Sequence, residues 1–259
     1  MKLFDTHCHL DFPVLRENIE EVLKRARQAG VRRFLVPGVN AEGWPLLMQL
    51  CSEHEGLYPA LGLHPCFLQS DHAADLELLE GWLNRKPEII AVGEVGLDLF
   101  IPQADLKFQL SVLQPQLVLA KQFDKPVLLH VRKAHDQMLK LLRQVRLNRG
   151  GIVHAFSGSE QQAREYLKLG FKLGIGGSIT YPRAKKLQRL VTQLPLDSFV
   201  LETDAPDMPL SGFQGQVNFP ERAARVLQEI ARIRQEPVSE VAQSVTIGSM
   251  KLMGLDEEY

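Results

Sequence analysis

Five of the eight histidines in this 259-residue chain follow short apolar runs, and acidic residues follow similar runs nearby. In Asp-Thr-His-Cys-His-Leu-Asp near the N-terminus the two histidines are two residues apart, so in an extended strand they project to the same side. Imidazoles with carboxylates suit Zn²⁺, and Mn²⁺ or Mg²⁺ fit better as oxygen ligands increase. One such histidine alone is more often a hydrogen-bonded core residue, but five together predict a metal site: His7, His9, His64, His130 and His154.

The candidate carboxylates and one arginine occupy equivalent places after other apolar runs. Glu94 closes one run, and Glu202 and Asp204 close another, where alternation again puts both on one side. Arg132 stands two residues after His130, so its planar guanidinium could bind a phosphate, with a salt bridge at the rim as the alternative role.

These residues need a scaffold that brings several strand ends together, and the chain alternates β-rich and helical runs from end to end. The β-rich runs are nearly continuous in apolar residues, as expected for parallel strands that are covered by helices. We expect eight strands, at Leu3–His7, Arg33–Pro37, Leu57–Leu63, Ile89–Glu94, Pro126–Val131, Gly151–Phe156, Phe171–Gly176 and Ser198–Asp204.

Eight β/α units in about 250 residues predict an α/β fold of the (β/α)₈ TIM-barrel type, with one domain spanning residues 1–259. In such barrels the chemistry lies at the C-terminal ends of the strands, where the polar candidates stand. An extra helix, about Val238 to Met253, closes the chain. A doubly wound open sheet would need a glycine-rich fingerprint after the first strand, and the His-Cys-His run stands there instead.

Composition restricts the classes of function. With 30 Lys and Arg against 31 Asp and Glu, the formal charge is −1, which argues against a protein whose whole surface binds nucleic acid and leaves a local basic groove open. The sequence contains no apolar run of about 18 residues and no secretory signal, and its three cysteines form no disulfide framework. We therefore expect a cytoplasmic protein with no membrane association and no obligate protein partner.

Six motifs in fixed order extend the argument: DTHCHLD, GLHP, GEVGLD, LLHVRKA, VHAFSG and ETDAP. In this order and spacing the chain resembles the TatD family of metal-dependent hydrolases over nearly its whole length, and within it the YjjV-type members. The resemblance implies an amidohydrolase-like barrel. Typical members are metal-dependent deoxyribonucleases.

The resemblance also implies two divalent metal ions, of which Zn, Mn and Mg are the candidates. One would be bound by His7, His9 and Asp204, the other by His130 and His154, with Glu94 bridging the two. Many relatives in the wider group use a carboxylated lysine as the bridge, and Glu94 favours the TatD-like branch.

Such a centre predicts hydrolysis by a metal-bound hydroxide, since two cations about 3.5–4 Å apart stabilise the attacking and leaving oxygens of a phosphodiester. Glu94, Asp204 and Glu202 are the candidate catalytic residues. Asp204 either also accepts the proton of the attacking water or acts only as a ligand. Glu202 orients a ligand or assists proton transfer, and the alternative, which is favoured for a residue of this kind, is a structural role behind the ligands. His64 and Arg132 are the candidate substrate-binding residues, His64 as a donor to a phosphate oxygen.

The chain departs from the family pattern at two rim segments. Gln214, Gln216 and Val217 stand where positive charge is common, and Leu99 and Phe100 stand where tyrosines are usual. Fewer cations and fewer stacking rings weaken the prediction of long DNA as substrate.

Three functions therefore remain in competition. The leading expectation is a phosphodiesterase or deoxyribonuclease, a 3'-5' exonuclease on single-stranded DNA ends. The second is a hydrolase of another ester, such as an aminoacyl-tRNA. The third is a non-catalytic metal-binding barrel, which the complete set of six expected ligands argues against.

Overall fold

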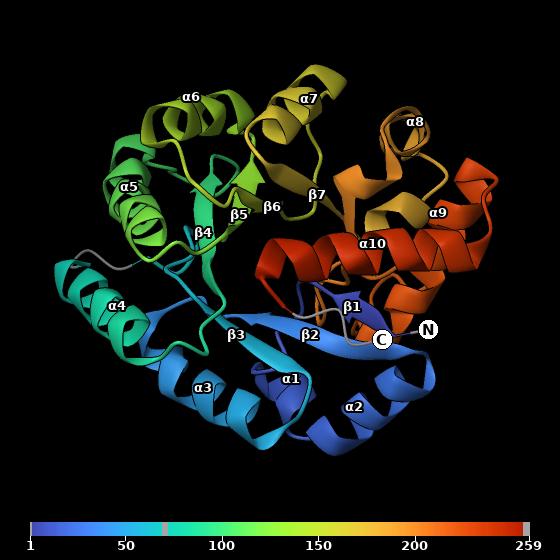
Figure 1. Cartoon of the computed structure of the whole chain (residues 1–259), viewed down its shortest axis with the longest axis horizontal. Helices are drawn as coiled ribbons and strands as arrows, with labels where there is room; N and C mark the ends of the chain where they lie inside the picture. The colour runs from blue at the N-terminus through green and yellow to red at the C-terminus, as the bar shows by residue number, and fades with distance from the viewer. Residues whose placement is uncertain (1, 69–71, 256–259) are drawn as a thin grey trace. The chain divides into compact units, whose positions relative to one another are not determined.

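The structure is a computed structural model that describes residues 2–68 and 72–255. All eight predicted strands are present (Figure 1), most of them shorter at one end than expected. Their bounds are β1 (Leu3–Asp5), β2 (Val31–Pro37), β3 (Leu57–Leu61), β4 (Ala91–Asp98), β5 (Val127–Arg132), β6 (Gly151–Val153), β7 (Phe171–Ile175) and β8 (Phe199–Leu201).

The helices lie between the strands, as the sequence predicts. They are α1 (Pro13–Arg16), α2 (Ile19–Gln28), α3 (Trp44–Glu53), α4 (Ala73–Arg85), α5 (Leu106–Gln122), α6 (His135–Val145), α7 (Glu160–Lys168), α8 (Lys185–Gln193), α9 (Ala223–Arg234) and α10 (Val238–Met253). Short 3₁₀ turns are η1 (Ala41–Gly43), η2 (Gly177–Thr180), η3 (Leu196–Ser198) and η4 (Pro220–Arg222). Within the described ranges, no helix combines the length and apolarity needed to cross a membrane.

The strand order is that of the sequence, β1 to β8, and the assigned neighbouring pairs are parallel. Parallel neighbours require crossover connections, which the intervening helices provide. This order confirms the predicted (β/α)₈ barrel class, and α10 is the predicted extra C-terminal helix. The chain divides into two compact units, and that all 259 residues form one domain stays a prediction.

The first unit comprises residues 2–36, 54–57 and 173–255 of the described chain. β1 pairs with β2, and β7 pairs with β8. The segment after β1 runs beside the segment after β8, because Thr6 N donates to the Leu201 carbonyl at 2.9 Å and His9 N donates to the Ala205 carbonyl at 2.8 Å. α10 packs against β1, β8 and α9 (Figure 1).

The second unit comprises residues 37–53, 58–68 and 72–172. Its central pair is β4 and β5, and α5 packs against β4 (Figure 1). The prediction that this strand ends at Glu94 is wrong, because β4 continues to Asp98. Gly96 lies opposite His130, where a Cβ would overlap the His130 backbone. This glycine marks a close approach of two strands rather than a strand end.

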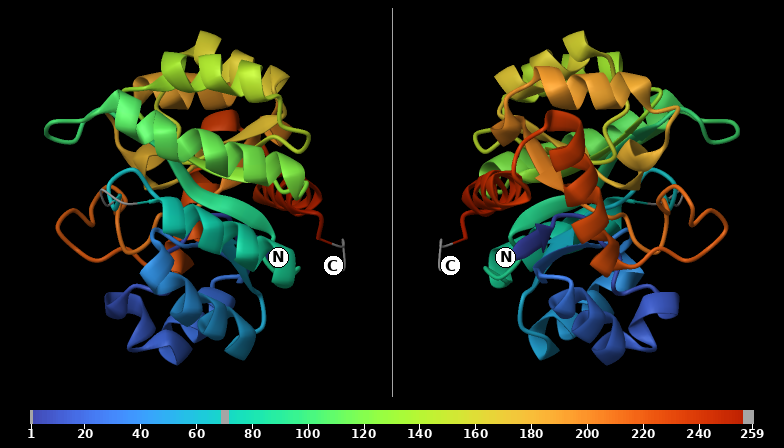
Figure 2. Two further views of the ribbon diagram at one scale, coloured as in Figure 1. Left: turned by 90° about the vertical axis from the view of Figure 1, so that its left-hand side faces the viewer. Right: turned by 90° about the vertical axis from the view of Figure 1, so that its right-hand side faces the viewer.

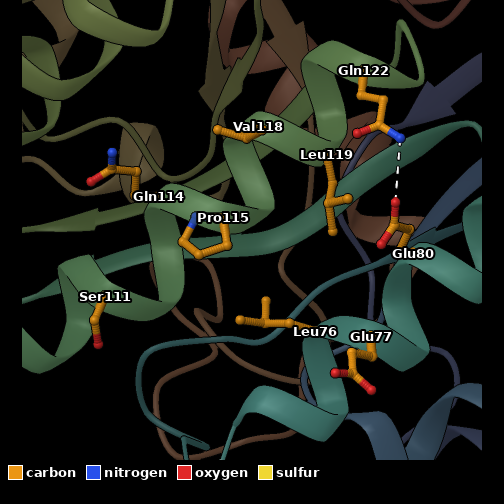
Figure 3. Close-up of a pocket in the computed structure, with 9 residues that line it drawn as sticks. All are labelled: Leu76, Glu77, Glu80, Ser111, Gln114, Pro115, Val118, Leu119 and Gln122. Atoms are coloured by element: carbon orange, nitrogen blue, oxygen red, sulfur yellow. Dashed lines mark hydrogen bonds between the residues drawn. The ribbon is translucent and has the colours of Figure 1, made fainter.

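A surface groove lies between α4 and α5 in the second unit, with a volume of about 490 Å³ (Figure 3). Leu76, Pro115 and Leu119 supply apolar side chains, and Gln122 Nε2 donates to Glu80 Oε1 at 3.3 Å. None of the predicted site residues lines this groove. The predicted chemistry therefore has to be sought at the strand ends.

Candidate metal centre

In the first unit, His7, His9 and Asp204 come together as the sequence predicts. His7 Nε2 lies 3.3 Å from His9 Nε2, and Asp204 Oδ1 lies 3.6 Å from His7 Nε2 and 3.7 Å from His9 Nε2. Both histidines are buried, and the Asp204 side chain is 14% exposed. These three ligand atoms lie close enough together to coordinate one divalent cation.

Backbone contacts between the first and last strands bring these three side chains together. Asp204 N donates to the His7 carbonyl at 2.9 Å, and Asp204 adopts a left-handed conformation with φ +58°, which aspartate tolerates better than most residues. Asp5 accepts hydrogen bonds from Thr203 N at 2.9 Å and Thr203 Oγ1 at 2.6 Å. Burial raises the pKa of Asp5 to about 8, although these hydrogen bonds oppose the rise. Asp5 therefore links the segment that carries His7 and His9 to the segment that carries Asp204.

Glu202 is fully buried rather than placed at a rim. A Cβ at Gly176 would lie 3.4 Å from Glu202, and a Cβ at Gly174 would overlap its carboxylate. Gly174 in β7 and Gly176 just after this strand therefore leave room for the Glu202 side chain. A role of Glu202 in proton transfer stays a prediction.

In the second unit, Glu94 and His130 make the central contact. His130 Nδ1 lies 3.1 Å from Glu94 Oε1, and His64 Nε2 lies 3.4 Å from the same oxygen. His154 follows β6 and is buried, and its ring is stacked relative to that of His130 at a centroid distance of 6.4 Å. These four predicted residues converge within this unit.

Asp98 joins the candidate site although the sequence pattern did not indicate it. It is buried at the end of β4, and its Oδ2 lies 3.1 Å from His130 Nε2. In the neutral ring with Nε2–H donating to Asp98, the Nδ1 lone pair would be available to a cation held beside Glu94. A carboxylate that fixes the tautomer and orientation of a ligating histidine in this way is common in metal sites.

The electrostatics of this pair follow from the same contacts. Burial alone would lower the pKa of His130, but the hydrogen bonds with Asp98 and Glu94 raise it to about 9. Burial would raise the pKa of Asp98, yet hydrogen bonds from His130 and from Phe100 N lower it to about 2. The protonated His130 ring is therefore held between the Glu94 and Asp98 carboxylates. Together the three groups carry a net negative charge, which favours a cation.

His64 has a defined tautomer. Cys66 N donates to His64 Nδ1 at 3.1 Å, so a neutral His64 carries its proton on Nε2. Burial lowers the pKa of His64, although nearby Glu94 opposes this, and the ring is neutral near pH 7. His64 therefore presents an N–H donor beside Glu94, as its predicted role in substrate binding requires.

Arg132 lies at the end of β5 with its side chain 53% exposed. Its guanidinium lies 4.0 Å from the centre of the Phe100 ring, and Nη1 lies 4.0 Å from Asp98 Oδ2. The guanidinium is thus held at the surface by a ring contact and a distant carboxylate. Its edges remain suited to an anion.

The segment after Asp204 contains positive charge that the sequence analysis overlooked. Gln214 and Gln216 are exposed and uncharged, as noted, but Arg222 lies 4.1 Å from the centre of the Phe213 ring and donates to the Val217 carbonyl at 3.0 Å. Asn218 Nδ2 donates to the Thr203 carbonyl at 2.9 Å. This bond holds the loop that contains Asn218 against Thr203, next to Asp204.

Comparison with known proteins places these donor sets in context. Residues 4–253 match a protein-family model described as TatD related DNase. The chain is 48% identical over 245 residues to the uncharacterized metal-dependent hydrolase YjjV of Escherichia coli K12, covering 94% of this chain and 95% of the relative. It is 31% identical over 255 residues to the uncharacterized metal-dependent hydrolase YabD of Bacillus subtilis, covering 98% and 100% of the two chains.

Solved structures give the same result for the fold. The crystal structure of YjjV from Escherichia coli, titled a TatD homolog, superposes with a TM-score of 0.95 at 47% identity over 98% of both chains. A TatD family hydrolase from Entamoeba histolytica superposes with a TM-score of 0.83 at 21% identity, over 97% of this chain and 98% of that one. The second likeness shows the fold alone.

Proposed function

We propose, because this chain belongs to the TatD family and is a metal-dependent hydrolase, that it cleaves phosphodiester bonds and acts on single-stranded DNA ends as a 3'-5' exonuclease. The observation that carries the proposal is the set of groups in the second unit. The carboxylate of Glu94 and the imidazole of His130 would serve as cation ligands, and His64 and Arg132 would serve as donors to an anion. A cation with neighbouring donors suits an anionic ester.

The ligand assignment follows the family resemblance. His7, His9 and Asp204 would hold one divalent cation, and Glu94, His130 and His154 would hold a second. The donor chemistry fits, since each unit supplies imidazoles with a carboxylate, which suits Zn²⁺ or Mn²⁺. When bound, the cations stabilise charge on phosphate oxygens and acidify water.

The chain's own residues perform the remaining steps. The Asp204 carboxylate accepts the proton of the attacking water, and the buried Glu202 orients the ligand set. His64 Nε2–H donates to a non-bridging phosphate oxygen, and the Arg132 guanidinium pairs with the neighbouring phosphate. Asp98 keeps His130 in the ligating tautomer.

A second candidate is hydrolysis of another ester, such as an aminoacyl-tRNA ester. The segment around Gln214 and Gln216 favours it, because its exposed side chains carry no charge to bind a long phosphate backbone. Such an ester needs the same metal ligands and fewer phosphate contacts near the reacting bond. Product analysis separates the two: released mononucleotides support the first, and intact deacylated tRNA supports the second.

Metal reconstitution tests the proposal. Chelator-treated protein is given Mg²⁺, Mn²⁺ or Zn²⁺ and assayed with a small phosphodiester and with end-labelled single-stranded DNA. We expect both to be cleaved, and Glu94→Gln to abolish both activities without loss of folding. Glu88→Gln is the matched control, because this carboxylate forms an exposed pair with Lys86 at 3.4 Å. Wild-type turnover in Glu94→Gln would refute the metal mechanism, and cleavage of the small ester but not DNA would refute the DNase assignment.

A further inference from the structure

The loop between β4 and α5 holds an aromatic ring in solvent. Residues 99–105 project from the second unit (Figure 2), and Phe100 near their start is 58% exposed. This is the highest exposure among the large apolar side chains of the described residues, ahead of Val118 at 49% and Phe67 at 44%. An exposed phenylalanine costs hydrophobic free energy, which a binding role would offset.

The backbone around this ring is fixed rather than loose. Phe100 N donates to Asp98 Oδ1 at 2.7 Å, and Leu99 N donates to the Arg132 carbonyl at 2.9 Å. The other oxygen of Asp98 holds His130 at 3.1 Å. The two oxygens of the buried Asp98 carboxylate therefore hold both the backbone at Phe100 and the ring of His130.

Arg132 adds a charge to the ring. Its guanidinium lies 4.0 Å from the centre of Phe100, so the cation stacks on one face and leaves its N–H edges available. The two side chains are 58% and 53% exposed. Together they present an apolar surface directly beside a bidentate anion donor.

We infer that Phe100 and Arg132 form a subsite for a nucleoside phosphate, in which the base stacks on Phe100 and the phosphate pairs with Arg132. This inference rests on the proposed phosphodiester function and names what the enzyme recognises at the substrate end. Stacking of a base on an aromatic side chain is tolerant of base identity. The subsite therefore recognises a terminal nucleotide through its base ring and its phosphate charge, whichever base it carries.

The test compares two probes that differ only in the base. Thymidine 5'-monophosphate and deoxyribose 5-phosphate are titrated calorimetrically into the metal-loaded, full-length protein, so the readout is affinity rather than turnover. We expect wild type to bind the nucleotide roughly 5- to 150-fold more tightly than the sugar phosphate, the range expected for one stacked base. Phe100→Leu should bring the two affinities within about twofold, and Phe100→Tyr should preserve the ratio.

Two further variants separate the roles. Arg132→Gln should weaken both probes, because both carry the phosphate. Phe67→Leu is the matched control, since this 44%-exposed ring contacts His64 and should leave the ratio unchanged. Equal binding of both probes by wild type, an unchanged ratio in Phe100→Leu, or a ratio lost in Phe67→Leu would each overturn the subsite while leaving phosphodiester hydrolysis intact. Failure of wild type to bind either probe would overturn the proposed function as well.

Discussion

Replacing Asp98 by asparagine tests whether a buried carboxylate tunes a metal-ligand histidine. The side chain keeps its shape and loses its charge, so His130 loses an ionised acceptor at 3.1 Å. In the metal-free protein, this acceptor and Glu94 overcome the effect of burial and raise the pKa of His130 to about 9. We expect the pKa of His130 to fall in the variant.

The size of the effect on metal binding follows from two opposing contributions. A hydrogen bond to a charged group contributes roughly 1.5–3 kcal/mol, and loss of such an outer partner typically weakens metal binding about 10- to 100-fold. Wild type, however, must release a proton from His130 to bind metal below pH 9. Its affinity should therefore rise with pH up to about 9, while that of the variant changes less. The difference in metal affinity between wild type and Asp98→Asn therefore increases with pH.

Zinc affinity is measured with a chelating buffer at pH 7 and pH 8.5, together with the imidazole titration by NMR. Asp105→Asn is the control, because this exposed carboxylate on the same loop caps α5 by accepting from Phe108 N at 3.0 Å, and asparagine caps equally well. The reasoning fails if Asp98→Asn binds zinc as wild type does at pH 8.5, or if the His130 pKa is unchanged.

Three further predictions concern stability. Gly174→Ala should lower the free energy of unfolding by roughly 1–3 kcal/mol in denaturant titrations, because a Cβ there overlaps the Glu202 carboxylate, whereas Gly176→Ala, with its nearest contact at 3.4 Å, should cost less. Burial raises the pKa of Asp11 to about 6, so folding disfavours its ionisation and wild type loses stability as pH rises from about 4 to 6. Asp11→Asn should therefore be more stable than wild type at pH 8 by on the order of 1–3 kcal/mol and equally stable below pH 4. Equal stability of the two proteins at pH 8 would contradict this. Asn218→Ala removes donors to the carbonyls of Thr203 at 2.9 Å and Met208 at 3.3 Å and should lower stability by about 1–3 kcal/mol; unchanged thermal unfolding would show that these bonds are dispensable.

Much of the fold can be read from the sequence because parallel strands buried on both faces are continuous apolar runs. The alternation rule predicted that His7 and His9 project together, and their Nε2 atoms lie 3.3 Å apart. These predictions need only local geometry. The last helix, Val238–Met253, has the bounds that its pattern predicts.

The features that the sequence did not reveal depend on contacts between segments. The predicted strand ends at Glu94, yet Gly96 permits β4 to approach β5, so Asp98 lies on the strand and not in a loop. Alternation from Glu94 through residue 96 to Asp98 is the signal that could have identified it.

The pairing of Asp5 with Thr203 spans 198 positions in the chain, and it has a consequence for protein synthesis. The ribosome synthesises His7 and His9 early, but their partner Asp204 is added about 195 residues later. Contacts of such high sequence separation are slow to form, and domains of this size fold with intermediates. A nascent or prematurely terminated polypeptide therefore carries two histidines without their carboxylate. Any activity that depends on all three is withheld from the cell until translation has passed Asp204.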